Sequence, residues 1–543
     1  MILGFAHISK SYFVTKINTQ ETNFNKHIDK SLVLTYNLSI FNKGGFNMKS
    51  IRKILVVLLV GVLGLVFASC SAGGSNMEMG YMPSVGLDVS GENYTEIVEN
   101  EFVSTITNPS SYFSIDANTA SYPNLRSLIN NGHSVPKDVV RVEEMLNYFN
   151  YDYPSPEDGE VFSVSGALFD TPYNSQTKLL TIGISAQKVE FTNVKNNIVF
   201  LIDVSGSMFS ADKLALVQES FRMLAENLNP EDRVSIVTYA GKSGVALSGA
   251  YGYEKQKITA VIEDLAAGGS TAGSQGIETA YEIAKQYFIE GGNNRVVLAT
   301  DGDFNVGISN VNALKEFIAE KRKTGVYFSV FGVGRGNVQS EIMESLALAG
   351  NGVYSYIDSQ KEARRALVEQ IGGSMVTVAK DVKAGITFKK EYIESYRLIG
   401  YENKLLSQEE FEDSATDAGE IGSGHTLTVV YEVKLTDLEF TPDMEIALVN
   451  LKYKPTENVG GDGQEVDLAV SIKTDDYHAE PTDTDIFVAS VVEFALILRD
   501  SIYKADADLN ALVTRLDLLD LSSDEYKEEF RNIVVKYRNL IEG

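Results

Sequence analysis

The chain has little of three kinds of residue on which many functional sites depend. It contains one cysteine, Cys70, in 543 residues, so no disulfide can form within it. The five histidines are scattered without the short spacing of metal ligands, which argues against a zinc site or a histidine-based triad. Lys and Arg number 47 against 74 Asp and Glu, a net charge of -27. We therefore expect no nucleic-acid binding, which depends on neutralising phosphates with cationic side chains.

A short apolar segment near the N-terminus has the pattern of an export signal. Arg52 and Lys53 precede an apolar run over 54–68, which is shorter than the roughly 20 residues that a membrane-spanning helix needs. Small residues follow the run, and together these features predict a secretory signal at 48–69. The position of Cys70 directly after Ala-Ser resembles the bacterial lipoprotein signal. That resemblance implies a lipid-modified Cys70 and a membrane anchor; the alternative is a plain signal peptide with an incidental cysteine.

One apolar run in the middle of the chain ends in oxygen-bearing side chains. Residues 198–202 are all apolar, as expected for a strand that is buried on both faces. Asp203, Ser205 and Ser207 follow directly. Hard cations bind oxygen, and Mg2+ takes few protein groups plus water. The stretch therefore predicts part of a divalent-cation site, which needs further oxygen ligands from later loops.

Those further ligands are found on the expected elements. From 196 to 371 strand and helix patterns alternate, which predicts an α/β fold with a doubly wound, mainly parallel sheet. Thr271 stands in a Gly-rich loop before a helix, and Asp301 follows another strand. Loops at the carboxyl ends of parallel strands converge on one crevice. The set Asp203, Ser205, Ser207, Thr271 and Asp301 therefore predicts a site for Mg2+ or Mn2+; the alternative is the same sheet with an empty site.

Two other glycine-rich stretches of this region are interpreted as plain loops. Gly332-Val-Gly334-Arg-Gly336 follows a strand but lies late in the sheet, without the first-strand context of a dinucleotide site. The loop 266–273 lacks the Gly-Lys-Ser/Thr of a phosphate-binding loop. Asp303 is either a group that orients a metal ligand or a solvated loop charge.

The five-residue pattern resembles the von Willebrand factor type A (VWA) domain and its metal-ion-dependent adhesion site. The resemblance implies that Ser205, Ser207 and Thr271 contact the metal through hydroxyls, while Asp203 and Asp301 act largely through water. It also implies that an acidic side chain of a protein partner completes the coordination. Four longer stretches resemble the bacterial YfbK-like proteins, whose family carries an N-terminal segment, a central VWA domain and a C-terminal domain of unknown function. These stretches are 113–122, 294–307, 396–403 and 417–425.

The flanking regions show patterns of structure without recognisable chemistry. Strict alternation over 427–435 and 466–472 predicts an antiparallel β-sandwich, and helical patterns follow from 485. The predicted parts are a misassigned upstream extension (1–47), a lipoprotein signal (48–69), a flexible tether (70–100), an N-terminal α+β segment (101–192), the VWA domain (193–373), and a C-terminal β-sandwich with helices (374–543).

These predictions describe a non-enzymatic lipoprotein of the bacterial cell envelope. We expect it to be anchored to a membrane through Cys70 and to bind the acidic side chain of a protein partner through the metal. One alternative is an envelope scaffold in which the metal is structural. Another is a metal-assisted hydrolase; against it, no pairing of a nucleophile with a base and no general acid is apparent near the predicted site.

Overall fold

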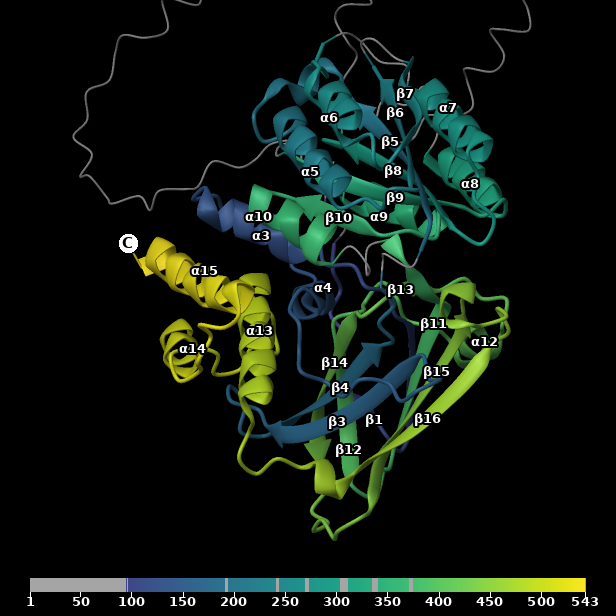
Figure 1. The fold of residues 1–543 in the computed structure, drawn as a ribbon. Helices are drawn as coiled ribbons and strands as arrows, with labels where there is room; N and C mark the ends of the chain where they lie inside the picture. The colour runs from purple at the N-terminus through teal and green to yellow at the C-terminus, as the bar shows by residue number, and fades with distance from the viewer. Residues whose placement is uncertain are drawn as a thin grey trace, which may run out of the picture. The chain divides into compact units, whose positions relative to one another are not determined.

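The computed structural model describes residues 94, 96–190, 194–240, 244–268, 273–302, 311–334, 340–370 and 375–542 (Figure 1). The strands are β1 (Val103–Ser104), β2 (Ser110–Ser114), β3 (Phe162–Asp170), β4 (Lys178–Ala186), β5 (Asn196–Asp203), β6 (Arg233–Tyr239), β7 (Gly244–Tyr251), β8 (Asn293–Thr300), β9 (Val326–Val333), β10 (Tyr354–Ile357), β11 (Thr377–Phe388), β12 (Ile393–Ile399), β13 (Gly419–Gly422), β14 (Thr426–Leu435), β15 (Glu445–Pro455) and β16 (Val466–Lys473). The α-helices are α3 (Ser121–Asn130), α4 (Val142–Asn147), α5 (Leu214–Glu226), α6 (Lys255–Glu263), α7 (Gly273–Gln286), α8 (Val311–Arg322), α9 (Ser340–Ala349), α10 (Gln360–Arg364), α12 (Gln408–Glu412), α13 (Asp483–Arg499), α14 (Leu509–Leu516) and α15 (Glu525–Glu542).

The central sheet has the predicted doubly wound, mainly parallel architecture. Its strand order is β10-β9-β8-β5-β6-β7, and only the edge strand β7 runs antiparallel to its neighbour. All eight residues of β5 are buried, with β6 and β8 paired in parallel on its two sides. The continuous apolar run of this strand is explained by that burial, since both of its faces are covered.

Helices cover both faces of the central sheet. Phe200 and Ile202 of β5 pack in one core with α5, α6 and α10, while Val199 and Leu201 pack in the other with α7, α8 and α9. In Figure 1, α5 and α6 lie on one side of the sheet and α7 and α8 on the other. The strand order reverses across β5, so its carboxyl end is the topological switch point at which ligands of such sheets bind.

The two flanking regions form one β-sandwich rather than two separate bodies. One sheet has the order β1-β12-β14-β4-β3, and the other has the order β13-β11-β15-β16 with β2 paired to β11. β3 and β4 come before the central domain in the chain and β12 and β14 come after it, yet β4 pairs with β14 over eight residues. The predicted boundaries placed these regions in separate parts, 101–192 and 374–543. Strand pairing across such a distance leaves no periodicity signal in either segment, so the sequence pattern could not reveal it.

A helical cluster packs against this sandwich. Its core joins α3 and α4 of the N-terminal region to α13, α14 and α15 near the C-terminus. Phe149, Phe487 and Phe530 meet there with ring centroids 5.0–5.4 Å apart and in edge-to-face orientation. Such aromatic contacts favour the packing beyond the area that they bury.

In the part of the chain that the structure describes, no helix combines the length and the apolar character needed to cross a membrane. The predicted signal at 48–69 and Cys70 lie outside the described residues.

Candidate metal centre

The candidate metal centre stands at the carboxyl ends of three adjacent strands. Asp203 is the last residue of β5, Tyr239 is the last residue of β6, and Asp301 follows Thr300 at the end of β8. Asp203 and Asp301 are both buried, 0% and 1% exposed. Two carboxyl groups are thus placed together at the switch point, where the sequence predicted them.

The carboxyl group of Asp203 is fixed by hydrogen bonds from all three strand ends. The backbone N–H of Ser205 donates to Oδ1 at 2.8 Å. The hydroxyl of Tyr239 and that of Thr300 both donate to Oδ2, at 3.0 and 3.4 Å. With its oxygens engaged in this way, Asp203 is suited to act on a cation through water. Burial raises the pKa of the Asp203 carboxyl and nearby Asp301 raises it further, while the hydrogen bonds from Ser205 and Tyr239 oppose the rise.

Ser205 and Ser207 bring two hydroxyl oxygens close together. Their Oγ atoms lie 2.8 Å apart, with Ser205 nearly buried and Ser207 partly exposed. In an octahedral Mg2+ shell with bonds of about 2.0–2.1 Å, neighbouring ligand oxygens are about 3 Å apart. The two hydroxyls therefore fit adjacent positions of such a shell. Among the described residues, no group of three or more His, Cys, Asp or Glu could hold a metal, so the donors on this edge are hydroxyls supported by two carboxylates.

Thr271, the remaining predicted ligand, lies outside the described residues, as does Asp303. The Gly-rich loop that carries Thr271 is described as far as Gly268. The backbone N–H of Gly268 donates to the carbonyl of Val204 at 2.9 Å, which holds Gly268 beside the end of β5. On the other side of Thr271, the α7 residue Gly276 packs so closely on Tyr239 that a Cβ there would lie 2.6 Å from the Tyr239 Cβ.

Three residues of this centre were not among the predicted site residues. Tyr239 and Thr300 orient Asp203, and Lys213 forms an ion pair with Asp301, with Nζ 2.8 Å from Oδ2. Tyr239 and Thr300 are the last residues of β6 and β8, two strands that the sequence did predict. Their positions at the sheet edge could therefore have marked them as site residues. Lys213 precedes α5 with no pattern that separates it from an ordinary surface lysine.

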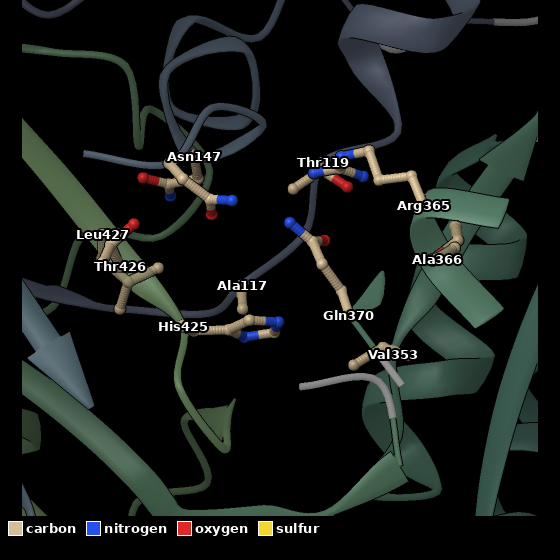
Figure 2. A pocket seen from close by; sticks show the side chains of 12 residues that line it. Ala117, Thr119, Asn147, Val353, Arg365, Ala366, Gln370, His425, Thr426 and Leu427 are labelled. Atoms are coloured by element: carbon tan, nitrogen blue, oxygen red, sulfur yellow. The ribbon is translucent and has the colours of Figure 1, made fainter. Parts of the chain in front are cut away.

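A separate pocket lies where the central domain meets the sandwich. Figure 2 shows His425 and Thr426 on one side of it and Arg365 and Gln370 on the other. The cavity measures about 20 Å³, enough for about one water molecule. The buried Nδ1 of His425 has no hydrogen-bond partner among the described residues, and burial with nearby Arg365 lowers the pKa of this histidine to about 4. The pocket is thus too small for a substrate, and its histidine is neutral at physiological pH.

Comparisons with known proteins match this architecture. The protein-family model described as von Willebrand factor type A domain matches residues 197–370. The protein-family model described as Uncharacterized protein YfbK, C-terminal, matches residues 373–540. A model described as von Willebrand factor matches 88–181. The protein YfbK of Escherichia coli (strain K12) is 37% identical over 434 residues, covering 76% of this chain and 74% of that protein. The chain belongs to the YfbK family.

More distant matches reach only parts of this YfbK-family protein. The human inter-alpha-trypsin inhibitor heavy chain H3 is 24% identical over 269 residues, covering 45% of this chain and 29% of that protein. The solved structure of a von Willebrand factor type A protein from Catenulispora acidiphila aligns with a TM-score of 0.38 and 16% identity, covering 71% of this chain and 91% of that chain.

Membership of the family confirms the predicted α/β fold and the central VWA domain. A domain of this type supports a role in protein interaction or as a scaffold, and such domains are usually non-enzymatic interaction modules. They commonly bind a divalent cation. The identity of a metal, the partner and the location in the cell remain predictions for this YfbK-family protein.

Proposed function

We propose that this protein binds a protein partner through a divalent cation held at the carboxyl end of β5. The Ser205, Ser207 and Thr271 hydroxyls would hold Mg2+ or Mn2+, with Asp203 and Asp301 acting through water. An acidic side chain of the partner would complete the shell. The observation that carries this proposal is the 2.8 Å separation of the two serine hydroxyls beside two buried carboxyl groups.

The surface around the centre supports binding of a protein rather than a small substrate. Phe209, two residues after Ser207, has 84% of its surface exposed, and Val245 on the edge strand β7 has 45% exposed. Val245 pairs with Val237, near the carboxyl end of β6, so it lies toward the same edge of the sheet as Asp203. Exposed large apolar side chains near a polar centre can become part of the apolar area that a protein partner buries.

The metal is expected to stabilise the native protein. A ligand that binds only the native state adds about 2.7 kcal/mol at 100 times its dissociation constant. Mg2+ or Mn2+ should therefore raise the melting temperature, and Ser207→Ala should remove most of that rise. Ser210→Ala is the matched control, because Ser210 is exposed and its hydroxyl donates to the Asp212 carboxylate, while its backbone bond to Lys213 is kept by alanine. Thermal unfolding with and without metal measures the effect; an equal shift in Ser207→Ala would contradict the site.

The same variants separate the adhesion proposal from the scaffold alternative. Crosslinking of a partner to the wild-type protein should disappear when EDTA is added. The Ser207→Ala variant should fail to crosslink to that partner to the same extent. If the partner stays bound under both conditions, the metal acts only on stability and the scaffold interpretation replaces the adhesion one.

We further propose that the protein is anchored to a membrane of the bacterial envelope by a lipid on Cys70. The support is the sequence alone: the basic and apolar segments of 48–69, the small residues before Cys70, and the presence of one cysteine. More than one acyl chain is needed for stable anchoring, and the lipoprotein modification supplies several.

Cys70→Ala is expected to move the protein from the membrane fraction to the soluble fraction of the cell. Fractionation and immunoblotting measure the distribution, with Ser71→Thr as a control that changes the residue after the cysteine and keeps the thiol. Retention of Cys70→Ala in washed membranes would show that the anchor lies elsewhere.

A further inference from the structure

The metal centre contains a cation that belongs to the protein itself. Lys213 Nζ lies 2.8 Å from Asp301 Oδ2, and the two side chains are 11% and 0% exposed. Removing a lysine and a carboxylate from water costs several kcal/mol per ion, and this cost can exceed the gain from their mutual attraction. A buried pair at this position is therefore weak evidence of a contribution to stability, and a role in the site explains it better.

The lysine is held in place by the residue that follows β9. Gly334 has φ +77°, and a Cβ on it would lie 2.5 Å from both Cγ and Cε of Lys213. The Gly334 carbonyl in turn accepts a hydrogen bond of 2.7 Å from the Tyr356 hydroxyl. The glycine thus leaves a slot for the lysine stem, which directs its ammonium group to Asp301. This slot gives the Gly332-Val-Gly334 stretch a structural purpose, in keeping with its interpretation as a loop that binds no dinucleotide.

Lys213 changes the net charge of the centre. Asp203 and Asp301 supply two negative charges when ionised, which a divalent cation neutralises. Lys213 adds one positive charge, so these three side chains and a divalent cation together carry a net charge of +1. The rest of the protein is acidic, with a net charge of -27 for the whole chain. A positive centre on such a surface attracts an anionic group that the surrounding protein would repel.

We propose that Lys213 tunes the centre for an anionic partner: it weakens the binding of the divalent cation and leaves the loaded centre positive, so that a carboxylate completes it. This inference rests on the proposed function, because it requires a cation at Ser205 and Ser207. Lys213 acts here through Asp301 as a positioning residue.

Removal of the lysine charge should strengthen binding of the divalent cation and weaken binding of the anion. Two like charges a few ångströms apart inside a protein repel strongly enough to change an affinity on the order of tenfold or more. We expect Lys213→Gln, which can still donate a hydrogen bond to Asp301, to bind Mn2+ about tenfold more tightly than the wild type. Lys213→Met should do the same without the hydrogen bond, and Lys213→Arg should keep the wild-type affinity.

The experiment titrates the full-length protein with Mn2+ alone and follows free Mn2+ by electron paramagnetic resonance. A second titration adds acetate as the anion probe. Acetate should tighten Mn2+ binding in the wild type and have little effect in Lys213→Gln. Lys257→Met is the matched control, since Lys257 is exposed on α6 and pairs with Glu254. Circular dichroism confirms that each variant is folded, and Lys213→Gln gives the decisive comparison if Lys213→Met is not.

The outcomes distinguish this inference from the proposed function. No Mn2+ binding by the wild type overturns both. Mn2+ binding by the wild type with equal or weaker binding by folded Lys213→Gln, or with an unchanged acetate effect, overturns the role of Lys213 and leaves the metal site standing.

Discussion

Arg126→Met is expected to destabilise the protein by about 3–5 kcal/mol, the cost of leaving buried carboxylates without their cation. Arg126 is 2% exposed and lies on α3. Its Nε donates to Asp358 at 3.0 Å, its Nη2 donates to Glu362 at 3.0 Å, and its Nη1 donates to Tyr148 at 2.9 Å and to Glu529 at 2.6 Å. One guanidinium thus joins the N-terminal region to the end of the central domain and to α15.

The urea midpoint of unfolding measures this loss, followed by circular dichroism. Arg222→Met is the matched control, because Arg222 pairs with Glu219 and Glu226 at the surface of α5 and such exposed pairs contribute about 0–1 kcal/mol. The urea midpoint of Arg126→Lys should lie between those of the two other variants, because lysine keeps the positive charge but cannot donate the paired hydrogen bonds of the guanidinium group. A loss below about 1 kcal/mol for Arg126→Met would mean that the carboxylates find other partners.

Lys404→Met is expected to destabilise the protein by about 3–5 kcal/mol at pH 8 and by less at pH 5. Lys404 is 8% exposed; its ammonium group forms an ion pair with Asp116 and lies 3.4 Å from Glu344. Glu143 and Glu144 lie nearby, and Lys404 lowers the pKa of both. Even with this lysine, burial and the neighbouring Glu344 raise the pKa of Glu144 to about 8.

The direction of the pH effect follows from the raised pKa of Glu144. A carboxyl group whose folded pKa exceeds the unfolded value of 4.5 stabilises the fold below that value, and the contribution is lost as the pH rises through about 8. Without Lys404 the pKa of this carboxyl rises further, so the variant loses most at the higher pH. Unfolding at the two pH values measures the difference. Lys473→Met, which breaks an exposed pair with Asp443, should show a small loss at both; a loss independent of pH in Lys404→Met would contradict the electrostatic explanation.

The fold of the central domain could be predicted because each of its elements has a local pattern. The apolar run of β5 is continuous because both faces of that strand are covered. The helix α3 lacks such a pattern: its first nine residues are all buried, so no polar stripe marks a solvent face. Hydrophobic periodicity therefore does not reveal this helix within the predicted N-terminal α+β segment. The glycines of β13 similarly hide its strand pattern, and Gly419 is required because the backbone of Ile115 lies against it and leaves no space for a side chain.

The candidate site could be predicted as far as its residues follow strand ends. Asp203, Ser205, Ser207 and Asp301 do so, and the structure brings Asp203 together with both serines and with Asp301 at one edge. Lys213 could not be predicted, because its contact with Asp301 depends on the slot at Gly334, which comes from a strand on the other side of β8. Contacts that depend on three separate elements leave no trace in the spacing of any one of them.

The sandwich shared between the two ends of the chain sets an order on biosynthesis. β3 and β4 leave the ribosome well before β12 and β14, the strands on the other side of their sheet, whereas the central sheet draws all its strands from one continuous stretch. Domains fold as units during synthesis, and an unpaired strand edge is prone to aggregation. The edge of β4 therefore stays open until the C-terminal strands emerge, and a nascent or truncated chain that ends before β14 presents this edge to chaperones and proteases while its central domain is already folded.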